Sequence, residues 1–229
     1  MTGFDFEIIQ RSLGYLFFEG MRFTLTLTVL AALGGVILGT LLAIIRLSGG
    51  PVLSAVAAGY VNLVRSLPLV LVIFWFYFLV PYVGQWLTGA SRPIHVGGFA
   101  SALITFIVFE AAYFSEIMRA GIASIPRGQS AAAMALGLTQ SQSMRYVILP
   151  QVFRIMLPVL LTQTVVLFQD TSLVYVLSIT DFLGAASKIA QRDGRLVEMY
   201  SFAALVYFVL SFAASRGVQR LRDRIAVPR

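Results

Sequence analysis

Residues 119–154 read RAGIASIPRGQSAAAMALGLTQSQSMRYVILPQVFR, a polar stretch between two strongly apolar segments. Pro126 ends any helix that arrives from upstream, because proline has no amide donor and its ring crowds the preceding turn. The run 130–136 is rich in Ala, Met and Leu, which favour helix, and Gly137 is a typical residue for a helix C-terminus. Thr139, with a glutamine three residues later, has the spacing of a capping box. The stretch therefore predicts two short helices, the first with a small-residue surface to which another protein can dock.

Most of the remaining sequence is apolar. Of 229 residues, 59% are hydrophobic and 12% are charged, whereas soluble proteins carry about 25% charged residues. Several apolar runs approach the ~20 residues that a helix needs to cross a bilayer. We therefore expect an all-α polytopic membrane protein, one transmembrane domain over residues 1–229, with spans at about residues 23–45, 67–87, 99–118, 152–177 and 198–214.

The segments between these runs are shorter or more polar. Residues 52–64 are too few to cross a bilayer, so we expect an interfacial helix or a lead-in to the second span. Residues 88–98 form a polar turn with the chain's one histidine, His95, to which we assign no role. Residues 178–197 have the composition of a polar connection, and an arginine-rich tail follows the last span. The sequence has no internal repeat or separate soluble domain.

The basic residues indicate the orientation of the chain. The formal net charge is +7, and the arginines flank apolar runs, which suits a membrane protein better than a nucleic-acid-binding protein. Five spans with the C-terminus inside place the N-terminus outside. Eleven of the 17 Lys and Arg residues then lie inside and six lie outside, in agreement with the positive-inside rule. This orientation puts the stretch 119–154 in the cytoplasm.

Two acidic residues occur within the expected spans, Glu110 and Asp170. A charged group at the centre of a membrane helix costs about 2.5–3.5 kcal/mol on insertion scales, so such groups usually face a cavity or a partner. One interpretation is a polar path for a solute, formed by Asp170, Thr171, Ser172, Gln163, Gln169 and Glu110. The other is that these side chains hold helices together by hydrogen bonds. Both interpretations stay open for Asp170, and packing is preferred for Glu110.

Nothing in the sequence indicates hydrolytic chemistry. A phosphate-binding loop needs a glycine-rich run that ends in Lys and Ser or Thr, and the surroundings of Lys188, the only lysine, do not fit. One histidine and no cysteine exclude a zinc cluster, a disulfide and thiolate chemistry. We expect no enzyme activity, metal or cofactor in this chain. Any energy source is then another subunit, which agrees with a docking stretch.

The docking stretch resembles a known cytoplasmic loop. Ala132 and Ala133, with Gly137 four residues on and the run 147–150 (VILP), are similar to the EAA loop of bacterial ABC importer permeases. In that family the first helix of the loop seats in a groove of the ATP-hydrolysing subunit. The family's usual acid falls on Ala131, so any salt bridge of that acid is not expected here. The alternative is an ordinary amphipathic loop between two membrane helices.

The resemblance implies a coupling loop at residues 126–146 and names the residues that contact the ATPase. They are Gly128, Gln129, Ala131, Ala132, Ala133, Ala135, Leu136, Gly137, Leu149 and Pro150.

Three further motifs are similar to one branch of the family, the His/Met-type permeases for polar amino acids. Residues 65–69 (RSLPL) resemble the opening of the second span, and residues 112–122 (AYFSEIMRAGI) with 127–129 (RGQ) resemble the approach to the loop. Residues 167–177 (LFQDTSLVYVL) look like the permease for glutamate and aspartate.

This resemblance implies a multi-pass protein of the bacterial inner membrane, with a periplasmic N-terminus and a cytoplasmic C-terminus. It implies a dimer of ATP-binding subunits that hold the ATP, a periplasmic solute-binding protein and a second homologous permease, with a heterodimer expected and a homodimer possible. The substrate is an amino acid, glutamate or aspartate, and membrane lipid surrounds the chain. Two alternatives stay open: a permease for glutamine, arginine or histidine, and a membrane scaffold without transport.

Overall fold

The computed structural model describes residues 4–94 and 96–225, and within these ranges the chain is helical with no β-strand. His95 lies outside the described residues. Five helical stretches are long and apolar enough to cross a membrane, which confirms the expected all-helical class: Phe6–Ser48, Leu69–Thr88, Gly98–Ala123, Gln140–Leu177 and Leu196–Ile225.

The first stretch is longer than the expected span at residues 23–45. It consists of α1 (Phe6–Tyr15), the π-helical η1 (Leu16–Met21) and α2 (Arg22–Ser48). The Asp5 carboxylate caps its start by accepting from the amides of Glu7 and Ile8. Such a cap satisfies amides that have no partner inside the helix, so the helix begins well before its apolar part.

The next two helices are separate. α3 (Pro51–Arg65) is a helix of its own, as one of the two interpretations of residues 52–64 has it. α4 (Leu69–Thr88) begins after Pro68 and ends at Gly89, whose φ of 66° is left-handed. The proline at the start of α4 is tolerated because its missing amide has no partner in a first turn.

α5 (Gly98–Ala123) is the most buried of the five stretches and lies at the centre of the fold. α2 packs along it through a Gly-x-x-x-Gly pair. A Cβ added at Gly39 would lie 2.8 Å from the Phe114 Cβ and 2.9 Å from the Ala111 carbonyl oxygen. The two helices approach this closely because glycine has no side chain at the contact.

The docking stretch contains α6 (Arg127–Ala135) and α7 (Gln140–Ser143). The second helix is not short, and here the sequence prediction was wrong. α7 continues through the π-helical η2 (Met144–Ile148) into α8 (Leu149–Asp170) and the 3₁₀-helical η3 (Thr171–Leu177). Pro150 does not break this helix, because the wider π turn directly before it accommodates a ring that would crowd a regular turn.

Residues 178–197 are more than a polar connection. They contain α9 (Phe182–Asp193), whose side chains at Phe182, Ala185, Ala186 and Ala190 are fully buried. Its charged residues lie on the opposite face. Because they are interspersed with the apolar residues along the sequence, the segment resembles a polar connection and its helical apolar face is hard to recognise. The following α10 (Leu196–Ile225) continues far beyond residue 214, so the described part of the expected tail is helical.

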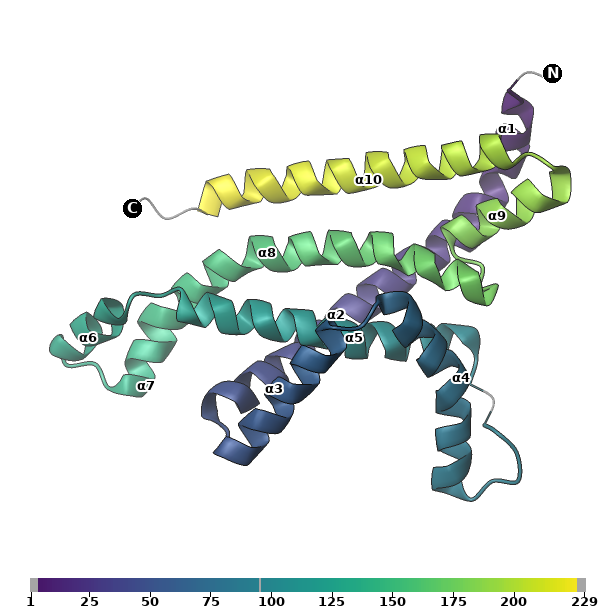
Figure 1. Cartoon of the computed structure of the whole chain (residues 1–229). Coiled ribbons are helices and arrows are strands. Elements are labelled where there is room, and N and C mark those ends of the chain that lie inside the picture. Colours follow the sequence, from purple (N-terminus) through teal and green to yellow (C-terminus); the bar gives the residue numbers. More distant parts are fainter. Residues whose placement is uncertain (1–3, 95, 226–229) are drawn as a thin grey trace.

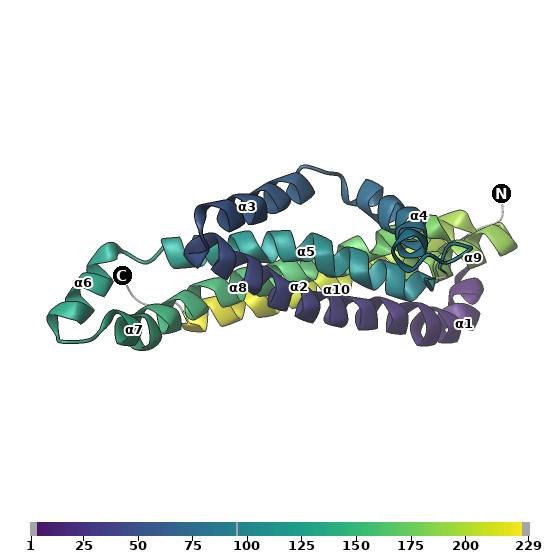
Figure 2. The same cartoon turned by 90° about the horizontal axis from the view of Figure 1, so that it is seen from below.

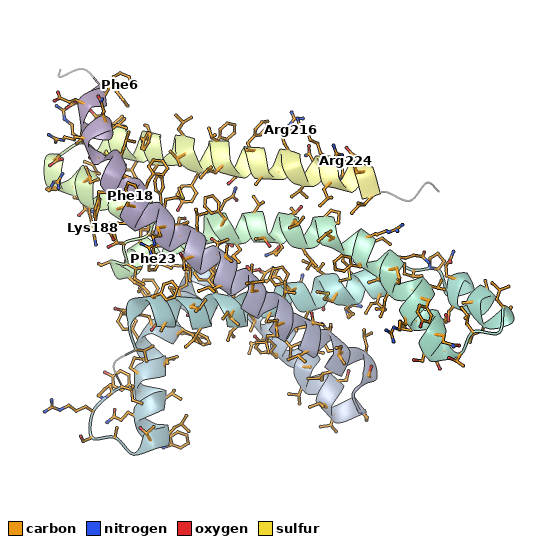
Figure 3. All side chains as sticks on the ribbon, turned by 180° about the vertical axis from the view of Figure 1, so that it is seen from behind. Phe6, Phe18, Phe23, Lys188, Arg216 and Arg224 are labelled. Atoms are coloured by element: carbon orange, nitrogen blue, oxygen red, sulfur yellow. The ribbon has the colours of Figure 1, made fainter. Side chains whose placement is uncertain are left out.

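The helices of the docking stretch and those that begin the chain lie at opposite ends of the molecule. α6, α7 and the C-terminal end of α10 lie at one end, and α1 and α9 lie at the other (Figures 1 and 2). Figure 3 shows Phe6 and Lys188 near one end of the bundle and Arg224 near the other.

Candidate coupling surface and polar path

Local hydrogen bonds shape the turn between α6 and α7. Gly137 has a φ of 85°, its amide donates to the Met134 carbonyl at 2.9 Å, and the Leu138 amide donates to the Ala133 carbonyl at 3.2 Å. This pair of bonds is a Schellman motif, which requires a left-handed residue at the glycine position. The expected capping box is also present, since Thr139 and Gln142 exchange hydrogen bonds at 2.9 and 3.3 Å.

The expected coupling residues form one exposed surface with a single exception. Leu136 is 84% exposed, and Met134 beside it is 50% exposed. Ala133 instead points inward and is 4% exposed. The remaining expected residues are exposed: Gly128, Gln129, Ala131, Ala132, Ala135, Gly137, Leu149 and Pro150. We call the exposed residues of α6 and its C-terminal turn the α6 surface; it is mostly apolar, with small side chains around the two large ones of Met134 and Leu136.

α6 is also joined to α8. The Gln151 side-chain amide donates to the Gln129 side-chain oxygen at 3.4 Å. Beneath the loop, an apolar cluster fills the space between α5 and the start of α8, with Ile148, Val152 and Met156 at its centre and Ile117, Ile122 and Ile125 against it. These contacts connect α6 to α8, and α8 to α5.

Glu110 holds α5 and α8 together. Its side chain is fully buried, and the Gln163 amide donates to its two oxygens at 3.1 and 3.4 Å. The backbone of α2 lies directly beside it, since a Cβ added at Gly35 would be 3.0 Å from the Glu110 Cβ. This geometry matches the packing interpretation of Glu110.

Asp170 has different surroundings. It is half-buried at the end of α8, two helical turns after Gln163 and so on the same face of the helix. Within residues 4–94 and 96–225 no side chain donates a hydrogen bond to its carboxylate. An acid at a helix C-terminus is also disfavoured by the helix dipole. Asp170 is therefore suited to binding a cation.

The other expected path residues do not lie on that face. Thr171 is fully buried, and its hydroxyl donates to the Phe168 carbonyl at 2.7 Å. Gln169 and Ser172 line a hollow of about 380 Å³ between α8 and α10, opposite Tyr207 and Ser211. The six residues thus divide among three places: Gln163 bonds to Glu110 and shares its helix face with Asp170; Gln169 and Ser172 line the hollow beside α10; and Thr171 is bonded to its own helix.

Sequence reasoning also missed the roles of Glu116 and Asp181, two of the other acids that the fold buries fully or in part. Glu116 on α5 pairs with Arg46 at the end of α2, at 2.6 Å, and with Arg119 at 2.9 Å. The sequence contained a signal for this ion pair. The first and third expected spans run in the same direction, so their C-termini lie at the same face of the membrane. An arginine and an acid near those two ends are candidates for a pair.

The second acid is Asp181, which is fully buried at the start of α9 and outside the five candidate spans. It accepts from the amides of Gly184 at 2.8 Å and Leu183 at 3.1 Å, and the Tyr207 hydroxyl donates to it at 3.4 Å. Burial raises the pKa of Asp181 to about 6, despite these donors. An aspartate followed by a run that contains leucine and alanine, which favour helix, was the available signal for a helix cap.

Known proteins are similar to this chain over nearly its whole length. The family of binding-protein-dependent transport system inner membrane components matches residues 35–227. The glutamate/aspartate import permease protein GltK of Escherichia coli O157:H7 is 53% identical over 226 residues, which cover 99% of this chain and 100% of GltK. The glutamine transport system permease protein GlnP of Escherichia coli K12 is 31% identical, over 98% of this chain and 99% of GlnP.

Solved structures agree with the fold. The crystal structure of an amino acid ABC transporter with histidines contains a chain with a TM-score of 0.85 and 29% identity, covering 98% of this chain and 99% of that one. The inward-facing MetNI methionine ABC transporter, with a TM-score of 0.74 and 18% identity, has the same fold.

Proposed function

This chain belongs to the family of binding-protein-dependent transport system inner membrane components, and from this premise we propose that it is one permease of an ATP-driven importer of glutamate and aspartate. The observation that carries the choice of solute is full-length identity. It is 53% to a glutamate/aspartate permease and 31% to a glutamine permease, over nearly the same residues. Membership of a transport family sets aside the scaffold without transport.

The chain is a multi-pass inner membrane protein that transports rather than catalyses. We place its N-terminus in the periplasm and its C-terminus in the cytoplasm. Two features support this orientation. The positive-inside rule favours it, and α6 lies at the same end of the molecule as the arginines of the last turns of α10 (Figures 1 and 3).

The partners follow from the loop and the family. A dimer of ATP-binding subunits engages the α6 surface, so that ATP is bound by those subunits and this chain holds no cofactor. A solute-binding protein delivers the amino acid from the periplasm. A second, homologous permease completes the pathway, and we propose a heterodimer with a different chain. Closure of the ATPases on ATP moves α6, and the spans alternate between inward and outward states.

Asp170 is proposed as the solute contact in this chain. An acidic amino acid carries one ammonium group and two carboxylates, so its site needs one anion. Of the two acids in the expected polar path, Asp170 has no donor to its carboxylate among the described residues, whereas Glu110 is occupied by Gln163. A second anion at the site would repel a solute whose net charge is negative, so a site with one anion is the better fit.

The experiment is ATP hydrolysis by the purified complex in lipid membranes. The binding protein is loaded in turn with glutamate, aspartate, glutamine, arginine or histidine. We expect glutamate and aspartate to stimulate hydrolysis and to be taken up, and the other three to have little effect. Stimulation by glutamine, arginine or histidine alone would overturn the solute assignment.

A further inference from the structure

Ion pairs between separate helical stretches lie at the two ends of the molecule. At the end with α1 and α9, Arg11 pairs with Asp193 at 3.0 Å. At the end with α6, one ion pair joins two candidate spans, as far as residues 4–94 and 96–225 show. It connects Arg46, near the C-terminus of α2, to Glu116 of α5 at 2.6 Å.

Two arginines hold the Glu116 carboxylate. Arg46 donates to one oxygen, and Arg119, one turn along α5, donates to the other from Nε at 3.1 Å and Nη2 at 2.9 Å. The side chains of Arg46 and Glu116 are 11% and 17% exposed, whereas that of Arg119 is 42% exposed. Water and salt screen the more buried pair less, so the link between helices is stronger than the link within α5.

Glu116 also adjoins the packing beneath α6. The next residue of α5, Ile117, packs against the apolar cluster at the start of α8. Glu116 and Met156 line one hollow of about 390 Å³ between α3, α5 and α8, and Met156 belongs to that cluster. Contacts therefore lead from α6 to α8 and from α8 to α5, and the Glu116 carboxylate on α5 continues them to α2.

We propose that Glu116 is a positioning residue that transmits the displacement of α6 to α2 through its ion pair with Arg46. The inference rests on the proposed function, because only a working importer has a displacement to transmit. α8 follows α6 through the bond between Gln129 and Gln151, and α5 follows α8 because the apolar cluster joins these two helices. The ion pair between Arg46 and Glu116 keeps the C-terminal end of α2 attached to α5 when the two helices slide or tilt. Arg119 belongs to the same helix as Glu116, so it orients the carboxylate and links no second helix.

The test compares Arg46→Gln with the matched control Arg119→Gln. Each removes one arginine from Glu116, but only the first breaks a link between helices. The readout is the ratio of ATP hydrolysis with solute-loaded binding protein to hydrolysis without it, in the complete importer. We expect Arg46→Gln to lower this ratio about tenfold, which is about 1.4 kcal/mol. Arg119→Gln should stay within about twofold of wild type, as is usual for an exposed ion pair.

Arg46→Lys keeps the charge and should recover most of the ratio. Equal losses in Arg46→Gln and Arg119→Gln, or an unchanged ratio in Arg46→Gln, would overturn the proposal. So would an Arg46→Gln chain that no longer copurifies with the ATPase, because the pair is then structural. If the wild-type complex responds to a different amino acid, the solute assignment alone fails, and the same comparison is made with that amino acid.

Discussion

The side-chain amide of Gln163 on α8 lies within hydrogen-bond distance of both carboxylate oxygens of Glu110 on α5, at 3.4 and 3.1 Å. The acid is fully buried, and α2 closes over it at Gly35. A buried acid with a matched donor stabilises one arrangement of three helices, and the same acid without its donor disfavours that arrangement.

Gln163→Leu should therefore destabilise the protein. It leaves the Glu110 carboxyl without its donor, at a cost of roughly 1–3 kcal/mol. The measurement is the thermal unfolding midpoint of the solubilised complex. Gln169→Leu is the matched control, because Gln169 is an exposed glutamine on the same helix. Equal midpoints for the two variants would show that the Glu110–Gln163 pair contributes nothing specific.

Asp170→Asn should reduce uptake and leave assembly intact. The substitution keeps the size of the side chain and removes its charge, and loss of a charge-assisted hydrogen bond to the solute ammonium costs roughly 1.5–3 kcal/mol. Uptake of glutamate and aspartate is measured at equal expression, together with basal ATP hydrolysis, which should survive. Uptake at the wild-type level would make Asp170 a helix-packing residue.

Ala135→Arg should abolish uptake while the chain still inserts. Ala135 is exposed on the α6 surface, where a long charged side chain holds the ATPase away. Copurification of the ATPase with the permease measures this directly, and Ala135→Ser is the conservative control. Normal copurification and uptake in Ala135→Arg would remove α6 from the coupling interface.

Gly137→Val tests the turn after α6. The left-handed φ of 85° at Gly137 is strained for a β-branched residue, whereas asparagine tolerates it better. We expect Gly137→Val to lose uptake and Gly137→Asn to retain most of it. The comparison separates backbone conformation from side-chain size, and equal uptake by the two variants would contradict the role of the turn.

The topology is open to a direct test, because the chain has no cysteine. Ser91→Cys should react with a membrane-impermeant thiol reagent in intact spheroplasts, and Ser141→Cys should react only after the membrane is opened. The two serines lie in the turn after α4 and in α7, at expected opposite faces. Labelling of the Ser141→Cys variant in intact spheroplasts would reverse the orientation.

The buried cap of α9 should make stability depend on pH. The pKa of Asp181 rises from its usual 3.8 to about 6 because the group is buried. A raised pKa means that the folded state binds the proton more tightly than the unfolded state. The resulting stabilisation is complete below about pH 4 and is lost as the pH rises through about 6. The free energy of unfolding, measured by denaturant titration, should therefore fall over that window. Asp181→Asn should remove the dependence, and an unchanged profile in this variant would contradict it.

Local rules predicted some parts of the fold well. The Gly137 stop and the Thr139 capping box involve groups within a few residues of one another, so the sequence contains all of the relevant chemistry. The five-span helical class was equally accessible, because hydropathy over ~20 residues is a strong signal.

Features that depend on tertiary contacts were not accessible in this way. The burial of α9 comes from Phe182 and a series of alanines packed against η1 and α10, whose positions the sequence does not give. Thr171 and Ser172 are adjacent in the chain, yet one faces its own backbone and the other faces α10. Sequence reasoning grouped the polar residues by proximity along the chain, whereas the helix distributes them around its axis.

The π-helical turn η2 lies between α7 and α8, so it sets how far α7 is rotated about the helix axis relative to α8. A π turn holds one residue more than a regular helix needs, and one residue corresponds to about 100° of rotation about the axis. Removing a single residue between Met144 and Ile148 would keep the helix continuous and turn α7, with the α6 surface attached to it, by about a quarter of a revolution. In the proposed function, the face that α6 offers to the ATPase therefore depends on the number of residues in this turn as well as on their chemistry.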